Sequence, residues 1–263
     1  MPFNLIDQKI RGAFSDAAIQ YDVLTGLHKE IGRELIDQIK DHEPSQYILD
    51  VGMGTGWFTN RLTYFFPDSI VVGLDFAPGM IEWAKKYNEG FRIIEGDARR
   101  MPFKKETFDI IVSNLSYQWV FNLNEAFQLA HQLLRGNGLF CFNMFGGKTF
   151  EELFESLGRT IDRKDKSEQI LIKRLASDAD IGRALANSGF HDVNLRQELI
   201  KVHFPDMVSL IKWIKDIGAN QVEKEFFIGR ELFQRANDYY NEHFRDRLGI
   251  VATFEVIWVK AKK

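Results

Sequence analysis

Apolar runs and amphipathic segments alternate along the first half of the chain. Five runs are short and almost uninterrupted, as in strands that are buried on both faces of a sheet, and they occupy residues 47–51, 71–75, 91–95, 108–114 and 138–145. The segments between them repeat apolar side chains at helical spacing, and they occupy residues 57–66, 78–88 and 123–134. This alternation predicts an α/β fold with a doubly wound parallel sheet.

The flanking segments add elements to this repeat. We expect helices at residues 9–22, 27–39, 150–157 and 167–175, a strand of mixed polarity at 193–204, a helical insertion at about 206–243 and a last apolar strand at 250–259. The sheet would then have seven strands. The inserted helices would form a lid over its carboxyl edge, just before the last strand.

The chain length fits one domain. At 263 residues the chain can bury a full α/β core, so we predict a single domain over residues 1–263. The core is expected at about 40–145, 190–204 and 250–260, and the lid and substrate elements at about 1–30, 148–180 and 206–247.

A glycine-rich turn follows the first expected strand. Gly52, Gly54 and Gly56 occupy every second position between that strand and the next helix. Glycine tolerates positive φ and has no Cβ, so a ligand can lie against the backbone amides of such a turn. On its own, this turn also fits an ordinary tight connection.

Polar residues at the ends of the next strands favour a ligand. Asp75 ends the second strand, 23 residues after Gly52. This separation is close to the roughly 20-residue offset at which a carboxylate meets a ribose. Gly96-Asp97-Ala98 ends the third strand, and Ser113-Asn114 ends the fourth. The carboxyl ends of parallel strands share one edge of the sheet, where open α/β sheets bind their ligands.

The spacing of the glycines separates the candidate cofactors. A nicotinamide-binding loop reads G-x-G-x-x-G, whereas this loop reads G-x-G-x-G with Asp50 two residues before it. A buried Asp50 is costly unless it hydrogen-bonds the loop or a cationic ligand. Together with Asp75, Asp97-Ala98 and Asn114, the loop resembles the motif series of class I S-adenosylmethionine-dependent methyltransferases, over roughly residues 10–145. The fold implied is their Rossmann-like doubly wound sheet.

This resemblance implies roles for individual residues. In the class, the glycine loop meets the methionine part of the cofactor, the acid at Asp75 binds the ribose and Asp97-Ala98 flanks the adenine. A related Phe-Ser-x-x-Ala-x-x-Tyr-Asp segment folds over the cofactor, which would bring Tyr21 to its methionine end. The expected cofactor-binding residues are Tyr21, Asp50, Gly52, Gly54, Gly56, Asp75, Phe76, Met80, Asp97, Ala98 and Asn114. A packing helix around Tyr21 and a core position for Met80 are the plain alternatives.

The stretch Ser113-Asn114-Leu115-Ser116-Tyr117-Gln118-Trp119 narrows the resemblance. Ser-Asn-Leu-x-x-Gln-Trp is similar to a motif of the malonyl-acyl-carrier-protein O-methyltransferases of biotin synthesis. Residues 13–21, 147–153, 217–220 and 252–256 point the same way and extend the likeness to the lid. There are departures, because Met53 replaces the usual Cys and Phe254 stands where Tyr is common.

The narrower resemblance implies a reaction. It is methyl transfer from S-adenosylmethionine, with S-adenosylhomocysteine as product, to the free carboxylate of a malonyl thioester on acyl carrier protein. An ionised carboxylate needs no general base, and the six histidines are scattered along the chain. It does need a group that orients it, and we expect Tyr117, Gln118 and Trp119 to align the substrate, with Lys148 as a further candidate. No Cys/His cluster suggests a metal.

Two other functions stay open at this point. One is another small-molecule methyltransferase of the same subclass, such as a quinone-precursor C-methyltransferase, which would need a base. The other is a cofactor-binding accessory protein without catalysis. The Tyr117-Gln118-Trp119 stretch favours an enzyme, because a Gln beside a Trp at a strand end suits a pocket better than a core.

Composition narrows the partners. A net charge of −3 argues against non-specific binding of nucleic acid. The single cysteine, Cys141, falls in an expected strand and fits a reducing compartment. No signal peptide or membrane span is expected, so we predict a cytoplasmic protein without a membrane partner. An acidic carrier protein would need basic docking residues, and a candidate cluster is Arg159, Arg163, Lys164, Lys166, Lys173 and Arg174.

Overall fold

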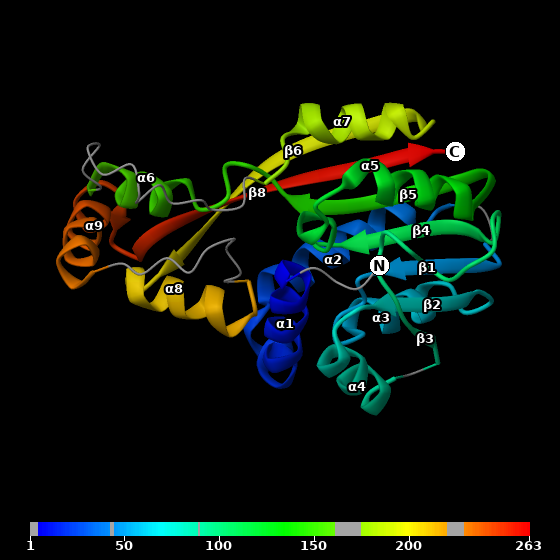
Figure 1. Ribbon diagram of the computed structural model, residues 1–263, viewed down its shortest axis with the longest axis horizontal. Helices are drawn as coiled ribbons and strands as arrows, with labels where there is room; N and C mark the ends of the chain where they lie inside the picture. Colours follow the sequence, from blue (N-terminus) through cyan, green and yellow to red (C-terminus); the bar gives the residue numbers. More distant parts are fainter. Residues whose placement is uncertain (1–4, 43–44, 89, 161–174, 220–228) are drawn as a thin grey trace.

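The computed structural model describes residues 5–42, 45–88, 90–160, 175–219 and 229–263. Seven strands follow one another across the sheet in the order β3-β2-β1-β4-β5-β8-β6 (Figure 1). Their bounds are β1 Tyr47–Val51, β2 Ile70–Asp75, β3 Arg92–Glu95, β4 Phe108–Asn114, β5 Leu134–Phe145, β6 His191–Phe204 and β8 Gly249–Lys262. A two-residue strand, β7 (Arg245–Asp246), pairs with β8 beside this path. The predicted seven-stranded, Rossmann-like α/β fold is confirmed.

The sheet is parallel only in part. Strands β1 to β5 pair in parallel, whereas β8 runs antiparallel to both β5 and β6. Strand β6 therefore runs in the same direction as β1 to β5, and the prediction of a parallel sheet is wrong for β8, which runs against both of its neighbours. The chain returns from β6 to β8 on the same side after the helical insertion, without a crossover, so these strands pair antiparallel.

Helices cover both faces of the sheet. Their bounds are α1 Leu5–Leu24, α2 Gly26–Ile39, α3 Trp57–Phe65, α4 Pro78–Lys86, α5 Leu123–Leu133, α6 Glu151–Thr160, α7 Asp178–Asn187, α8 Met207–Asp216 and α9 Arg230–His243. Alternate residues of β1 face opposite layers, because successive side chains of a strand point to opposite faces. Ile48 joins the cluster packed under α2 and α3, and Leu49 joins the cluster under α5 and α7.

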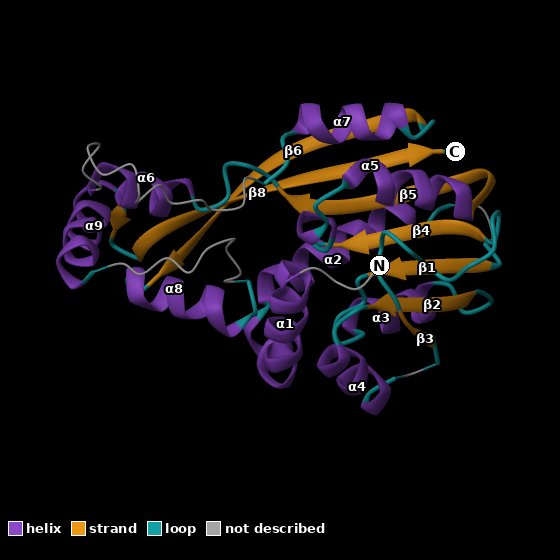
Figure 2. Ribbon diagram, viewed as in Figure 1, coloured by secondary structure: helices purple, strands orange, loops and turns teal. Residues whose placement is uncertain are grey.

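Strands β6 and β8 run well beyond the other strands (Figure 2). Each has 14 residues, and α6, α8 and α9 pack around the part that projects from the core (Figure 1). We call this projecting part the extension. The two inserted helices were predicted, but they do not lie together. Helix α8 contacts α1 beside the core, whereas α9 packs against α6 at the far end of the extension.

Some predicted elements differ from the observed ones. The helix predicted at residues 167–175 lies outside the described residues, apart from Leu175, which is not helical. Helix α7 was not predicted, although Ser177 and Asp180 form a capping box at its start. That pair is a sequence signal for a helix N-terminus.

Candidate functional site

The turn between β1 and α3 depends on its glycines. Gly52, Gly54 and Gly56 have φ values of 79°, 56° and 85°, in the left-handed region that favours glycine. A Cβ on Gly52 would lie 2.0 Å from Ser116 Oγ, so only glycine fits there. A Cβ on Gly54 would meet no atom within 4 Å, because Gly54 faces open space. The turn is therefore tight against Ser116, just after β4, on one side and open on the other.

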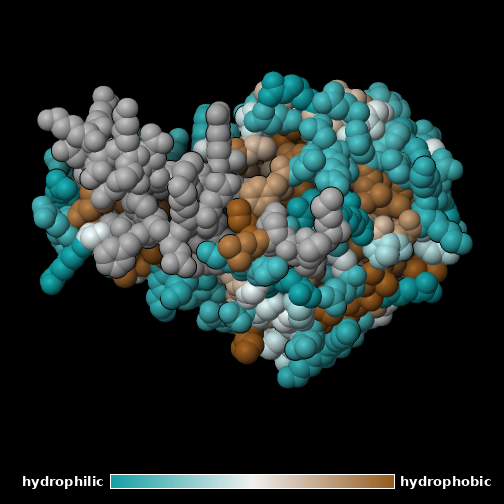
Figure 3. All heavy atoms as spheres, in the orientation of Figure 1, coloured by the Kyte–Doolittle hydropathy of each residue, from teal (hydrophilic) through white to brown (hydrophobic). Residues whose placement is uncertain are grey.

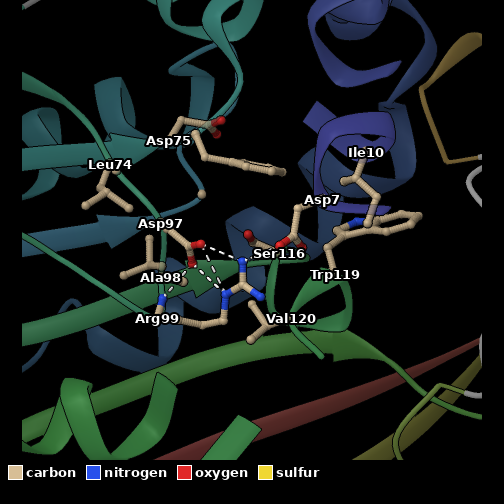
Figure 4. Close-up of a pocket in the computed structure, with 14 residues that line it drawn as sticks. Asp7, Ile10, Leu74, Asp75, Asp97, Ala98, Arg99, Ser116, Trp119 and Val120 are labelled. Atoms are coloured by element: carbon tan, nitrogen blue, oxygen red, sulfur yellow. Dashed lines mark hydrogen bonds and ion pairs between the residues drawn. The ribbon is translucent and has the colours of Figure 1, made fainter. Parts of the chain in front are cut away.

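Two cavities lie beside this turn and share Gly52. The first has a volume of about 450 Å³, and its lining includes Asp75, Phe76, Asp97, Ala98 and Trp119 (Figure 4). The second has a volume of about 420 Å³, and its lining includes Tyr21, His28, Gly54, Trp57 and Asn114. Eight of the eleven expected cofactor-binding residues, Gly52 included, therefore line one cavity or the other.

Asp75 holds the turn in place. Its carboxylate accepts hydrogen bonds from the backbone N–H groups of Gly54 and Ala77, both at 2.8 Å. Burial raises the pKa of Asp75, and these backbone donors act in the opposite direction. The carboxylate thus connects the end of β2 to the glycine turn and to the start of α4, beside the first cavity.

Asp97 and Asp7 meet at one guanidinium on the floor of the first cavity (Figure 4). Arg99 donates to Asp97 Oδ2 at 2.6 Å and to Asp7 Oδ2 at 2.8 Å. Burial alone would raise the pKa of Asp97, but the hydrogen bonds and charge of Arg99 hold it below its usual range. These bonds fasten α1 to the end of β3 across the cavity.

Helix α1 also reaches the second cavity. Tyr21 lines that cavity, and burial, with the charges of Asp75 and Asp22, raises its pKa. Asp22 accepts a hydrogen bond from Thr55 Oγ1 at 2.7 Å, which joins α1 to the glycine turn. The approach of Tyr21 to the methionine end of the cofactor stays a prediction, and Tyr21 lies beside the glycine turn in this cavity.

Asp50 lies beneath the turn and lines neither cavity. It is 1% exposed and accepts a hydrogen bond from Thr59 Oγ1 at 2.6 Å. Its other oxygen, Oδ1, has no hydrogen-bond partner within the described residues. Burial raises the pKa of Asp50 to about 7. In the folded protein, the partner of Asp50 is thus the hydroxyl of Thr59 on α3. The sequence analysis had expected a loop amide or a cationic ligand instead.

Met80, Gly56 and Tyr117 also lie away from these two cavities. Met80 packs in a hydrophobic cluster with Ala18 and Ala77 between α1 and α4, as the plain alternative had it. Gly56 is the N-cap residue of α3, and a Cβ on it would lie 2.8 Å from the ring of Phe91. Tyr117 is fully buried, and its ring contacts the rings of Phe127, Phe140 and Phe142. The expectation that Tyr117 aligns a substrate is wrong for this geometry, because the 3-10 turn Tyr117–Trp119 directs its ring into the core.

The neighbours of Tyr117 behave differently from one another. Gln118 is 5% exposed, donates to the carbonyl oxygen of Leu115 at 2.7 Å and lines neither cavity. Trp119 lines the first cavity and stands edge-on to Phe14. Asn114 lines the second cavity, where its amide donates to the carbonyl oxygen of His28 at 3.1 Å. Of the three proposed substrate-aligning residues, Trp119 lines one of these two cavities, and Tyr117 and Gln118 line neither.

His28 is a cavity residue that the sequence analysis missed. It is 8% exposed, it lines the second cavity and burial lowers its pKa to about 4. A usable signal was present, because His28 precedes Ile31 and Leu35 by three and seven residues on the buried face of α2.

Within the described residues no group of His, Cys, Asp and Glu could hold a metal ion. No described helix is long and apolar enough to cross a membrane.

Comparisons with known proteins agree with this geometry. A family described as methyltransferase domain matches residues 49–142. The malonyl-[acyl-carrier protein] O-methyltransferase of Geobacter sulfurreducens is 31% identical over 98% of this chain and 100% of its own length. The chain belongs to the malonyl-[acyl-carrier protein] O-methyltransferase family. It is therefore an S-adenosylmethionine-dependent methyltransferase, and both the broad and the narrow resemblance are confirmed.

Other relatives of this methyltransferase are more distant. The enzyme of the same name from Methylococcus capsulatus is 27% identical over 95% of this chain and 92% of its own. Among solved structures, the YcgJ protein of Bacillus subtilis has a TM-score of 0.62 at 16% identity, over 90% of this chain and 98% of its own. A putative methyltransferase of Bacillus halodurans has a TM-score of 0.61 at 18% identity, over 89% and 99%. Such low identities show the fold alone.

Proposed function

We propose that this methyltransferase transfers a methyl group from S-adenosylmethionine to the free carboxylate of a malonyl thioester on an acyl carrier protein. The observation that carries the proposal is the 31% identity to the Geobacter sulfurreducens enzyme, which extends over 98% of this chain and 100% of that enzyme. The match covers 98% of this chain, so it includes the extension and its helices. By the resemblance, the product is a precursor of biotin.

The residues around the two cavities fit this cofactor. The open space over Gly54 leaves room for a ligand against the backbone amides of the turn. We assign the adenosyl part to the first cavity, with Asp75 at the ribose and Phe76, Asp97 and Ala98 near the adenine. The methionyl part is assigned to the second cavity, beside the glycine turn, Tyr21 and Asn114. When bound, the cofactor supplies a methyl group activated by a sulfonium.

The chemistry asks little of the protein beyond alignment and exclusion of water. A carboxylate oxygen forms a bond to the methyl carbon while the bond from carbon to sulfur breaks, and no proton is transferred. The negative carboxylate and the positive sulfonium become a neutral ester and a neutral thioether. Opposite charges that vanish in this way react faster in an apolar site than in water. The aromatic lining that Tyr21, Phe58 and Trp57 give the second cavity provides such surroundings.

The carrier protein is also part of the proposal. Of the basic cluster suggested as its docking site, Arg159 is described, and it pairs with Glu155 on the same helix. Arg163, Lys164, Lys166, Lys173 and Arg174 lie outside the described residues. We therefore retain the carrier as partner and leave its docking surface unassigned.

Release of S-adenosylhomocysteine with a panel of acceptors tests the proposal. The panel is malonyl-carrier protein, acetyl-carrier protein, malonyl-coenzyme A and a quinone precursor. We expect release with the malonyl thioesters, because only they carry a free carboxylate beside the thioester. Release with the acetyl thioester as well, or with the quinone precursor alone, would contradict the assignment of the acceptor.

A further inference from the structure

One cavity residue has no role in the site described so far. His28 lies in the first turn of α2 and lines the second cavity. Its ring contacts those of Tyr21 at 6.0 Å, Phe145 at 5.6 Å and Trp213 at 6.2 Å between centroids. These three rings belong to α1, to the end of β5 and to α8. His28 therefore lies where the glycine-loop side of the cavity meets the elements of the extension.

The fold itself does not satisfy the imidazole. Nδ1 of His28 is buried and has no hydrogen-bond partner within the described residues. A buried polar atom without a partner costs free energy, so it points to a ligand that supplies one. If His28 had only a structural role, as a histidine hydrogen-bonded within the core, its Nδ1 would have a partner there.

The backbone around His28 is held firmly. Its carbonyl oxygen accepts from Asn114, whose own Oδ1 accepts from Asn143 Nδ2 at 3.1 Å. Asn143 is fully buried and also accepts from the backbone N–H of Leu115 at 2.8 Å. Two strand ends thus fix the position of His28 without using its ring. This is the arrangement expected of a preorganised binding residue.

The rings around His28 belong to an aromatic cluster that extends away from the glycine loop. Trp213 and Phe145 both contact Phe254 of β8, and Phe254 contacts Phe150. These rings follow β8 from the core into the extension. Figure 3 shows hydrophobic atoms exposed at the junction between core and extension. The His28 ring therefore lies between the second cavity, which it lines, and this aromatic cluster.

We propose that the imidazole of His28 hydrogen-bonds the carboxylate of the acceptor and orients it toward the methyl group. This inference rests on the proposed function, because it assumes an acceptor that carries a carboxylate. The imidazole donates one N–H and keeps its proton throughout the transfer. Nothing is oxidised or reduced, and the bonds that form and break are those of the proposed reaction.

The electrostatics of the cavity favour this role. Burial holds the pKa of His28 near 4, so the ring is neutral at pH 7. A cation would stabilise the ionised acceptor more than the transition state, in which the charge is disappearing, and would slow transfer. Lys29 is the cation in the lining, and its ammonium donates to the carbonyl oxygen of Asp22 at 2.6 Å. A neutral donor orients the carboxylate at a smaller penalty.

The test compares His28→Leu, which removes the donor, with His28→Gln, which keeps a neutral donor. The matched controls are His191→Leu and His191→Gln, at an exposed position of β6. For each variant, kcat and KM with malonyl-carrier protein and the Kd for S-adenosylhomocysteine are measured. His28→Phe replaces His28→Leu if the latter does not unfold cooperatively.

We expect His28→Leu to lower kcat/KM by at least about tenfold, because a hydrogen bond to a charged group is lost. His28→Gln should stay within about threefold of the wild type, and the Kd for S-adenosylhomocysteine within about twofold. Equal losses in both variants, or a parallel loss of cofactor affinity, would overturn the inference, as would an unchanged kcat/KM. A wild type that methylates no malonyl thioester refutes the proposed function as well, and that result is distinct because it precedes any substitution.

Discussion

At the scale of single residues, Asp50 connects burial to pH dependence. Its pKa is raised to about 7 by burial, so the folded protein retains a proton that the unfolded chain loses near pH 4. The unfolded state therefore binds fewer protons between these pH values, and stability falls as pH rises through this window. The contribution of Asp50 is fully present below about pH 4 and is lost as pH rises through 7.

Asp50→Asn removes the ionisable group and so tests whether the titration of Asp50 changes stability with pH. Asn keeps an oxygen that can accept from Thr59 and cannot ionise. Measured without cofactor by urea unfolding, the variant should gain about 2 to 3 kcal/mol relative to the wild type when the pH is raised from 5 to 8. A stability difference that stays constant over this range would show that Asp50 does not titrate there.

Asp75 should matter for the cofactor rather than for the fold alone. Hydrogen bonds from ribose hydroxyls to a carboxylate are worth roughly 1.5 to 3 kcal/mol each, so Asp75→Ala should weaken binding of S-adenosylhomocysteine by at least about tenfold. Calorimetry measures this, with Asp68→Ala in an exposed turn as the control. Cooperative unfolding confirms that the variant is folded. An unchanged Kd would place the ribose elsewhere.

Sequence motifs identified which residues matter more reliably than they predicted where side chains point. Asp75 and Asp97 were expected at the cavity because strand ends share one edge of the sheet, and they lie there. Tyr117 and Met80 were expected at the site but face the core, since their direction depends on a 3-10 turn and on how α1 packs against α4. Helical spacing marks His28 as buried, yet only the folded arrangement shows that its neighbours line a cavity.

At the scale of elements, the glycine turn makes two different demands. Gly52→Ala forces a Cβ against Ser116, whereas Gly54→Ala places one in open space beside the second cavity. Both positions have positive φ, so each substitution costs about 1 kcal/mol in backbone strain. The clash makes Gly52→Ala the more destabilising of the two.

The pair of substitutions therefore separates folding from binding. We expect Gly54→Ala to melt only a few degrees below the wild type and yet to bind S-adenosylhomocysteine at least about tenfold more weakly, because its Cβ occupies the cofactor's space. Gly52→Ala should melt lower than Gly54→Ala. Thermal unfolding and calorimetry check both statements, and full cofactor affinity in Gly54→Ala would move the ligand away from this turn.

Elements with strong local patterns were predictable, and those set by tertiary packing were not. The strands of the core and the helices between them follow from continuous apolar runs and helical spacing. The projection of β6 and β8 beyond the core was not predicted, because β6 alternates polar and apolar residues whether it pairs in the core or outside it. The direction of β8, antiparallel to both of its neighbours, likewise depends on how the insertion returns the chain.

At the scale of the whole molecule, core and extension share one hydrophobic cluster. It runs from Ile36 of α2 through Trp258 and Phe254 of β8 to Leu210 of α8 and Tyr240 of α9. The extension is thus packed continuously with the sheet that carries the cofactor cavities.

The position of the transferred methyl group tests the central claim most directly. Wild-type enzyme is incubated with malonyl-carrier protein and with S-adenosylmethionine that carries a labelled methyl group. The mass of the intact carrier protein is then measured by mass spectrometry before and after treatment with mild base. We predict one added labelled methyl per malonyl group, and its loss in base, because a carboxylate methyl ester hydrolyses. A labelled methyl that survives base, as one attached to carbon would, or a carrier of unchanged mass, would contradict methylation of the free carboxylate.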